Sequence, residues 1–218
     1  MNNNQTLKAS PTLNRLTGKW AEQIAVVNTK NLFLSGTWQG LKTTGLEEII
    51  KTIQEQKEFL PRGLAETNVD YKQIIPYVVF KFQDQHNQTN NDLYFLMQRK
   101  ATASESRLAH NYSLGIGGHL REKDLKSASV FDWAQREFNE EINYTDPFTI
   151  ELIGMINDDS NEVGQVHLGL VMVVTGSTKN ISIKSELKNG QLLTLDECNT
   201  YYNQMETWTQ IVFDTLKK

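Results

Sequence analysis

The pattern of apolar and polar positions predicts a chain in which strands and helices alternate. Short apolar runs at 25–27 and 31–34 predict two strands near the start. Apolar side chains then recur at helical spacing, at positions 46, 49, 50, 53 and 60, with charged residues between them. A helix is therefore expected from Leu46 to Leu60, where Pro61 ends the pattern.

The rest of the chain is richer in strands. Apolar, β-branched and aromatic residues form runs at 75–82, 93–99, 148–156 and 166–174, and the polar stretch between the first two predicts an exposed hairpin loop. An amphipathic pattern from about 129 to 142 predicts a central helix, and apolar spacing predicts a terminal helix over 195–216. This order of elements favours an α/β fold with a mixed β-sheet and helices on both faces.

The size and charge of the chain limit its domain organisation and the kind of ligand that it is expected to bind. With 218 residues, of which 39% are hydrophobic, it is long enough to bury a core, and no repeat or linker interrupts it. We therefore expect residues 1–70 to be an N-terminal extension packed on a main domain that covers 71–218. The formal net charge of −4 argues against binding to nucleic acid, which requires a concentrated basic surface, and favours a small soluble ligand.

Three features predict a cytoplasmic protein. The single cysteine, Cys198, has no partner for an internal disulfide, which fits a reducing compartment. No apolar run reaches the roughly 20 residues that cross a bilayer, so no membrane association is expected. Residues 1–11 are polar and lack the apolar segment of a secretory signal, so we expect a frayed tail there.

The residues of most chemical interest lie on the predicted central helix. Glu137, Glu140 and Glu141 are three and four positions apart, so they share one face within about one turn. A cluster of like charges destabilises a helix unless a cation offsets it, and hard divalent cations such as Mg²⁺ or Mn²⁺ prefer oxygen ligands. Taken alone, however, the three residues are more typical of a solvated acidic face.

A glycine-rich turn before this helix changes the interpretation. Gly117 and Gly118 let the backbone approach a metal ion or a phosphate closely. Together with Arg136-Glu137-Phe138-Asn139-Glu140-Glu141, this turn resembles the signature of the Nudix hydrolases. The box of that family reads Gly, five residues, Glu, seven residues, Arg-Glu, an apolar residue, any residue, Glu-Glu, any residue, Gly and an apolar residue. Its second half is matched from Arg136 to Ile142, and again at Tyr144.

The first half of the box is less complete. Gly118 lies 18 residues before Arg136, where the box has 14, so the intervening loop is longer. Ala128 occupies the position of the first box glutamate. Asn143 replaces the closing glycine, and asparagine also tolerates the left-handed conformation that often ends a helix. The three carboxylates to which the resemblance assigns the metal are retained.

The resemblance implies a Nudix-type α/β/α sandwich with a mixed β-sheet, and it implies residue roles. Glu140 and Glu141 would hold one or more Mg²⁺ or Mn²⁺ ions, Glu137 would ligate metal or act as base toward an attacking water, and the Gly117 carbonyl would complete the metal shell. Arg136 and Gly118 would be structural. The implied reaction is hydrolysis of a diphosphate linkage in a nucleoside diphosphate attached to another group, so the expected substrate is a nucleotide or a nucleotide sugar.

Residues outside the box add candidates. Glu186 is expected to supply a further acidic metal ligand, with Asp158, Asp159 and Glu162 as rivals that are more often plain loop residues. Arg99 and His119 are candidates for substrate binding. His167 is expected to be a residue of the sheet face, and His86 and His110 are expected in loops. Most of Tyr77, Tyr94, Trp133 and Trp208 should be core, with a base-stacking partner among them.

Two classes of function stay open. The retained carboxylates favour a Nudix pyrophosphohydrolase, whereas Ala128 favours a Nudix-like nucleotide-binding regulatory domain with weak or no turnover. The N-terminal extension would either shape the pocket or pair two subunits in a homodimer. The identity of the nucleotide is carried by loops that contain no transferable motif.

Overall fold

The computed structural model describes residues 16–83, 92–99, 111–125, 127, 129–184 and 187–218. Its strands are β1 (Gln23–Asn28), β2 (Gly40–Lys42), β3 (Glu58–Pro61), β4 (Tyr71–Phe82), β5 (Leu93–Arg99), β6 (Tyr112–Ser113), β7 (Gly115–Gly117), β8 (Ile142–Asn143), β9 (Phe148–Asn157), β10 (His167–Gly176), β11 (Ser182–Ile183) and β12 (Leu187–Leu193). Its α-helices are α1 (Thr29–Leu32), α2 (Leu46–Gln56), α3 (Arg62–Ala65), α4 (Val130–Glu141), α5 (Leu195–Cys198) and α6 (Thr207–Leu216). Short 3-10 turns are η2 (Gly18–Ala21), η4 (Glu122–Asp124), η5 (Gly164–Val166) and η6 (Asn199–Gln204).

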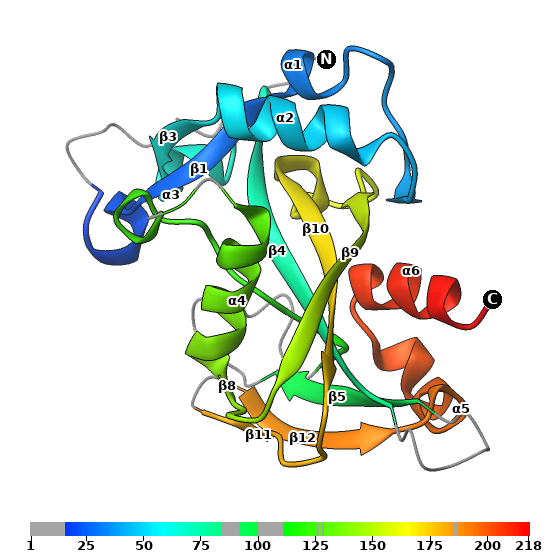
Figure 1. Ribbon diagram of the computed structural model, residues 1–218. Helices are drawn as coiled ribbons and strands as arrows, with labels where there is room; N and C mark the ends of the chain where they lie inside the picture. The colour runs from blue at the N-terminus through cyan, green and yellow to red at the C-terminus, as the bar shows by residue number, and fades with distance from the viewer. Residues whose placement is uncertain (1–15, 84–91, 100–110, 126, 128, 185–186) are drawn as a thin grey trace, which may run out of the picture.

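One mixed sheet of ten strands forms the centre of the described fold (Figure 1). Six strands follow the order β12-β5-β4-β10-β9-β2, and β1, β3, β6 and β7 pair beside this path. Strands β4 and β10 are parallel, from Gln73 opposite His167 to Phe82 opposite Gly176. The neighbouring pairs, such as β10 with β9 and β4 with β5, are antiparallel. The predicted mixed sheet is therefore confirmed.

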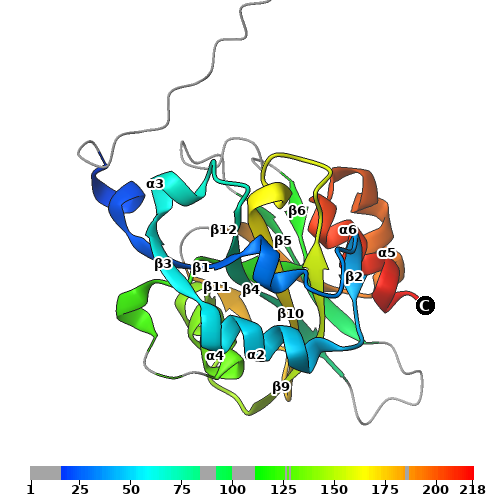
Figure 2. The same cartoon turned by 90° about the horizontal axis from the view of Figure 1, so that it is seen from above.

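Successive side chains of a strand point to opposite sides of the sheet. In the β4–β10 pair, both of these sides are buried. Val78 and Phe80 pack on one face in the cluster that includes residues of α2 and α4. Tyr77 and Val79 pack on the other face with Phe213 of α6. Figures 1 and 2 accordingly place α4 and α6 on opposite sides of the sheet. The expected α/β/α sandwich is confirmed.

Segments that precede β4 belong to the same sheet. Strand β1 pairs with both β3 and β4, and β2 continues the sheet beyond β9. Ala25 and Val27 of β1 lie in the main core, and Ile24 and Val26 form a smaller cluster on the other side of the strand. Described residues before 71 therefore pack on the sheet and extend it, while the division of the chain at residue 70 stays a prediction.

The local predictions differ from the structure in the type of one element, in the ends of others and in one strand that was missed. Residues 31–34 are not a strand, because α1 begins at Thr29, where the Asn28 side chain accepts the Lys30 amide at 3.0 Å. The helix predicted over 46–60 ends at Gln56, because residues 58–61 pair with β1. The helix predicted over 195–216 is divided into α5, η6 and α6, since Met205 and Glu206 are extended. Strand β12, which the pattern does not predict, pairs with β5.

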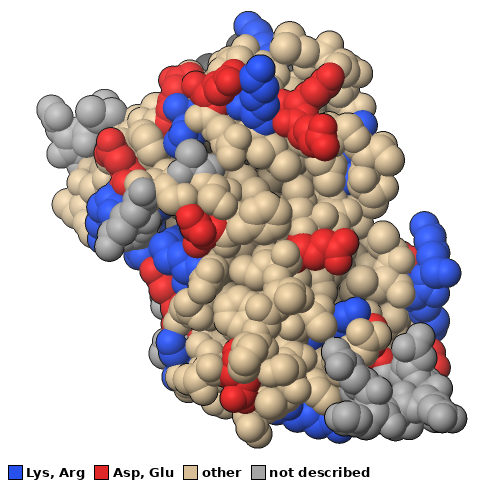
Figure 3. All heavy atoms as spheres, in the orientation of Figure 1, with Lys and Arg blue, Asp and Glu red and all other residues tan. Residues whose placement is uncertain are grey.

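The surface carries charges of both signs. On the face shown in Figure 3, Lys and Arg side chains lie interspersed with Asp and Glu side chains. This mixture agrees with the small formal net charge of −4. Within the described ranges, none of the helices has the length and apolar character needed to span a membrane.

Candidate active site

Helix α4 fixes the acidic residues of the site. Its buried side chains recur every three or four positions: Val130, Trp133, Ala134, Glu137 and Phe138. The ring of Phe138 stacks on that of Phe80 in β4, with centroids 6.0 Å apart and planes 4° apart. This packing holds the apolar side of α4 on the sheet and brings Glu137, Glu140 and Glu141 to the edge of a cavity.

The carboxyl group of Glu137 is the most enclosed of the three, since only 5% of the residue is exposed. Burial raises the pKa of this carboxyl to about 7, Arg136 opposes the rise, and Glu140 and Glu141 reinforce it. Gly118 lies directly against this group, because a Cβ atom at position 118 would be 2.2 Å from Oε1 of Glu137. The absence of a side chain at position 118 therefore lets the loop approach the carboxylate this closely, and a larger residue would displace the end of the Glu137 side chain.

Two arginines contact the acidic residues. Arg136 donates from Nη1 to Oε1 of Glu140 at 2.6 Å and from Nη2 to Oε2 of Glu137 at 3.2 Å. Arg121 donates from Nη2 to Oε1 of Glu140 at 3.1 Å. Because Nη2 of Arg136 also donates to the carbonyl oxygen of His119 at 3.4 Å, this side chain connects α4 to the glycine-rich loop.

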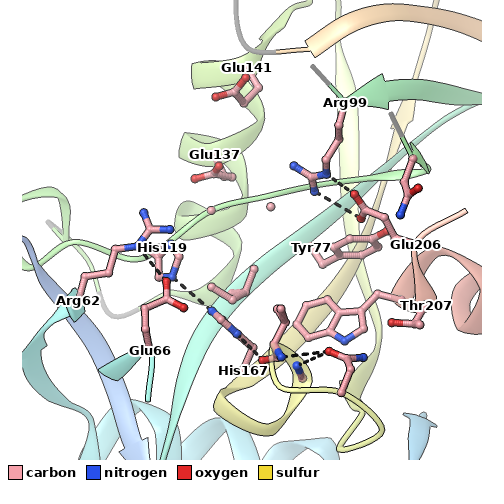
Figure 4. A pocket seen from close by; sticks show the side chains of 18 of the residues that line it. Arg62, Glu66, Tyr77, Arg99, His119, Glu137, Glu141, His167, Glu206 and Thr207 are labelled. Carbon is pink, nitrogen blue, oxygen red and sulfur yellow. Dashed lines mark hydrogen bonds and ion pairs between the residues drawn. The ribbon is translucent and has the colours of Figure 1, made fainter. Parts of the chain in front are cut away.

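A second polar cluster lies beside the first. Potential ligand atoms of Glu66, His119 and His167 all lie within 4.8 Å of one another (Figure 4). Nε2 of His119 is 2.8 Å from Oε1 of Gln73 and 3.4 Å from Nε2 of His167. Nδ1 of His167 donates to the carbonyl oxygen of Val163 at 2.6 Å. Burial is the main cause that lowers the pKa of both histidines, so both rings are neutral near pH 7.

Both clusters line one cavity of about 710 Å³, a size typical of small-molecule sites. Figure 4 shows Glu137 and Glu141 on α4, the histidine cluster on another side, and Arg99 with Glu206 on a third. Trp20, Tyr77 and Trp208 add aromatic surface to the same cavity. The arrangement therefore combines carboxylates, imidazoles, a guanidinium group and aromatic rings around one ligand-sized space.

Arg99 is held at the cavity wall by a buried carboxylate. Its guanidinium group forms an ion pair and two hydrogen bonds with Glu206, a residue that is 6% exposed. Nearby, Tyr77 and Trp208 meet edge to face with ring centroids 5.7 Å apart. The Tyr77 hydroxyl lies 2.7 Å from Oγ1 of Thr209, and burial raises the pKa of Tyr77 to about 12, so this tyrosine is neutral.

The structure brings most of the predicted site residues together. The cavity is lined by Gly117, Gly118, Glu137, Glu140, Glu141, Arg99 and His119. The positions of Glu186, Ala128, His86 and His110 lie outside the described residues. Among the rivals of Glu186, Asp158 accepts from Gln39 and Ser160, Asp159 accepts from Lys72, and Glu162 lines the cavity.

Sequence reasoning missed part of the second cluster. Glu66 and Gln73 belong to no motif, and His167 was expected only as a residue of the sheet face. His167 does begin β10, yet its ring also lines the cavity, because the parallel register places it beside Gln73 of β4. Only the pairing of two distant strands reveals this contact, so no local pattern could have found it.

Comparisons with known proteins agree with this geometry. No protein-family model matches the sequence. Protein YmaB of Bacillus subtilis is 35% identical over 214 residues, which cover 92% of this chain and all of YmaB. The crystal structure of Tm1382, described as a candidate Nudix hydrolase, matches with a TM-score of 0.73 and 29% identity, over 89% of this chain and 98% of Tm1382.

A more distant neighbour shares the fold. The NUDIX domain of Shewanella oneidensis NrtR, solved in complex with ADP ribose, matches with a TM-score of 0.52 and 12% identity. The match covers 67% of this chain and 86% of that domain. Since the helix with the Arg136-Glu137 motif lies against the glycine-rich loop within the shared fold, the chain belongs to the Nudix hydrolase family.

Proposed function

We propose that this protein is a metal-dependent pyrophosphohydrolase that cleaves a diphosphate linkage in a nucleoside diphosphate attached to another group. The observation that carries the proposal is the position of Glu137, Glu140 and Glu141. All three line a cavity of about 710 Å³, opposite groups suited to a phosphate and a base. A solvated acidic face, the alternative for these residues, does not account for a glutamate that is 5% exposed.

The donor set fits a hard divalent cation. Three carboxylates of one helix face the cavity together with Gly117, whose carbonyl is the fourth oxygen donor that we propose. Burial, reinforced by Glu140 and Glu141, raises the pKa of Glu137 to about 7, and a nearby cation would favour the ionised form of this carboxyl. When bound, Mg²⁺ or Mn²⁺ would lower the pKa of a ligated water and neutralise charge that develops on the phosphate oxygens.

The residues of the chain then take the following roles. Glu140 and Glu141 hold the cation, and Glu137, whose pKa burial raises to about 7, holds it as well or accepts a proton from the attacking water. Arg136 positions α4 against the loop through Glu137, Glu140 and the His119 carbonyl. Gly118 leaves room for the Glu137 carboxylate. Glu186 stays in the proposal as a further metal ligand.

Substrate contacts come from the other walls. Arg99, oriented by Glu206, offers a guanidinium group for a phosphate, and His119 contributes to the same wall of the cavity as Glu66. Trp208 and Trp20 offer aromatic faces for a nucleobase. We propose a small nucleotide or nucleotide sugar as substrate in the cytoplasm. A homodimer is the assembly to test, by light scattering of the full chain.

The proposal is tested by incubating the protein with Mg²⁺ or Mn²⁺ and a panel of ADP-ribose, NADH, dinucleoside polyphosphates, sugar nucleotides and nucleoside triphosphates. A coupled phosphatase makes the phosphomonoester products visible. Turnover that requires metal and is lost in Glu140→Gln is the expected result. Metal-dependent nucleotide binding without turnover would replace the proposal by a regulatory domain, and an absence of both would reject the site.

A further inference from the structure

The cavity contains a second group of potential metal ligands that is separate from the α4 carboxylates. Glu66 follows α3, His119 follows β7, and His167 begins β10, so three distant segments of the chain meet here. We propose that Glu66, His119 and His167 form a second metal site, selective for a borderline transition-metal ion such as Zn²⁺ or Co²⁺ over Mg²⁺. The proposal does not depend on the proposed hydrolysis, because its observable is binding of the ion.

The spacing of the two imidazoles suits a shared ion. Two nitrogens bound to one tetrahedral Zn²⁺ at about 2.0–2.1 Å lie about 3.3–3.4 Å from each other. The Nε2 atoms of His119 and His167 are 3.4 Å apart. One carboxylate oxygen of Glu66 and one ring nitrogen of each histidine all lie within 4.8 Å of one another. The pair of rings therefore already has the separation that an ion would impose.

The surroundings orient the ligands as a metal site requires. Nδ1 of His167 donates to the Val163 carbonyl at 2.6 Å, which leaves the Nε2 lone pair directed at His119. Arg62 donates from Nε to Oε1 of Glu66 at 3.2 Å and holds that carboxylate at the cluster. Backbone carbonyls and charged side chains that fix the ligands in this way are a regular feature of metal sites.

The buried side chain of Gln73 borders the cluster. This side chain is fully buried, and its Oε1 lies 2.8 Å from Nε2 of His119. Its Nε2 atom has no hydrogen-bond acceptor among the residues that the structure describes. Buried amides are rarely left unsatisfied, and an amide N–H group is satisfied by an acceptor such as a water and not by a cation. Of the two polar atoms of this side chain, only the amide oxygen carries a lone pair that a cation could use.

The alternative is a plain hydrogen bond between the two histidines. In that arrangement the single proton on Nε2 of His119 must serve both Gln73, at 2.8 Å, and His167, at 3.4 Å. The contact to His167 is then too long for a good hydrogen bond, so the alternative leaves the ring of His167 poorly partnered on that side. A shared ion would satisfy both nitrogens at their present separation.

The ligand types separate this site from the one on α4. Imidazole nitrogens suit Zn²⁺, Co²⁺, Ni²⁺ and Fe²⁺, whereas a set of carboxylates suits Mg²⁺. An ion here would link the segment of Glu66 to the loop that carries Gly118 and to β10. It would also place positive charge on the cavity wall, so that His119 would act on an anionic ligand through the ion.

The test uses the full chain without a histidine tag, stripped of metal by a chelator and kept in a large excess of Mg²⁺ to occupy the α4 carboxylates. Co²⁺ is titrated while its visible absorption is recorded, and Zn²⁺ competition is followed by calorimetry. His119→Gln and His167→Gln remove one ligand each. The matched control is a double variant of the remaining two histidines, His86→Gln with His110→Gln. Melting curves in chelator verify that each variant is folded.

We expect one Co²⁺ per chain with the absorption of nitrogen ligation, displaced by Zn²⁺ and retained in the control and in Glu140→Gln. Binding should weaken by on the order of 100-fold or more in His119→Gln and in His167→Gln, with Glu66→Gln as a second test that preserves volume. Equal binding in the wild type and both histidine variants would overturn the proposal, and so would loss of binding in Glu140→Gln or an absence of saturable binding.

Discussion

The buried carboxyl group of Glu137 makes the stability of the metal-free protein depend on pH. The informative change is Glu137→Gln, which keeps the size of the side chain and its hydrogen-bonding capacity but removes the ionisation. Because Glu137 is 5% exposed and lies beside Glu140 and Glu141, its ionised form is disfavoured in the folded protein. The variant therefore removes a penalty that the wild type meets only when this carboxyl loses its proton.

The size of the penalty follows from the pKa of the group in the two states. The pKa of Glu137 is about 7 in the folded protein against an ordinary value of 4.5. At 1.36 kcal/mol per pKa unit, this difference corresponds to about 3 kcal/mol. The sign is that of a raised carboxyl pKa: stability is complete below pH 4.5, declines as the pH rises toward 7, and stays low above it.

The assay is urea denaturation in the presence of a chelator at pH 5.0 and pH 8.5. Between these two values, the free energy of unfolding of Glu137→Gln should rise relative to the wild type by about 2.5 kcal/mol, since titration of all other groups is common to both proteins. Glu151→Gln, which changes an exposed glutamate of β9, should show no such difference. Adding Mg²⁺ should stabilise the wild type more than the variant, because a bound cation favours the ionised carboxylate.

A difference between Glu137→Gln and the wild type that is the same at both pH values would refute this reasoning. It would mean that the carboxyl group is solvated in the folded protein, or that the charge of Arg136 compensates the charge of the ionised carboxylate. The inference that the acidic cluster calls for a cation would then lose its support.

Three further predictions concern the elements that position the site. Gly118→Ala should lower turnover by about 100-fold with little change in melting temperature, because a Cβ atom 2.2 Å from Oε1 of Glu137 must displace that carboxylate; turnover like that of the wild type would contradict the close approach. Phe138→Ala should cost about 3–5 kcal/mol in urea unfolding, since the ring is fully buried, whereas Phe131→Ala on the same helix, at a residue that is 44% exposed, should stay within about 0.5 kcal/mol of the wild type. Asp159→Asn should cost about 2 kcal/mol, because the Lys72 side chain is 2% exposed and its ammonium would lose the charged partner at 2.6 Å and keep only the Gly164 carbonyl, although Asp159 itself is 48% exposed. Lys72→Met in the same background should recover part of this loss, and an additive double variant would argue against the ion pair.

Local pattern was sufficient for the central elements of the fold. Residues 75–82 and 166–174 are mostly apolar; the first run lies in β4, and the second, from His167 on, lies in β10, and both faces of these strands are buried. Strand β12 escaped prediction because Leu187–Leu193 includes Lys188, Asn189 and Gly190, which are poor strand formers, so only pairing with β5 defines it. The break before α6 depends in the same way on the bridge between Met205 and Tyr112, a contact over a long distance in the sequence.

In the candidate site, too, some residues are predicted by local sequence spacing and others only by the contacts of the folded chain. Glu137, Glu140 and Glu141 are neighbours in one helix, so their spacing alone predicts their cluster. Glu66 reaches the cavity through the packing of α3, and His167 reaches it through the parallel register of β10 on β4. Neither contact can be predicted from the local sequence. The burial of Glu137, and hence its raised pKa, likewise depends on how the loop of Gly118 closes over it.

The measurement that tests the central claim most directly is the dependence of turnover on Mg²⁺ concentration, for the best substrate of the nucleotide panel, in the wild type, Glu140→Gln and Glu151→Gln. The account predicts saturable activation by Mg²⁺ in the wild type and in Glu151→Gln, and loss of that activation in Glu140→Gln. Turnover without a divalent cation, or activation that survives in Glu140→Gln, would contradict the assignment of the α4 carboxylates as the metal site.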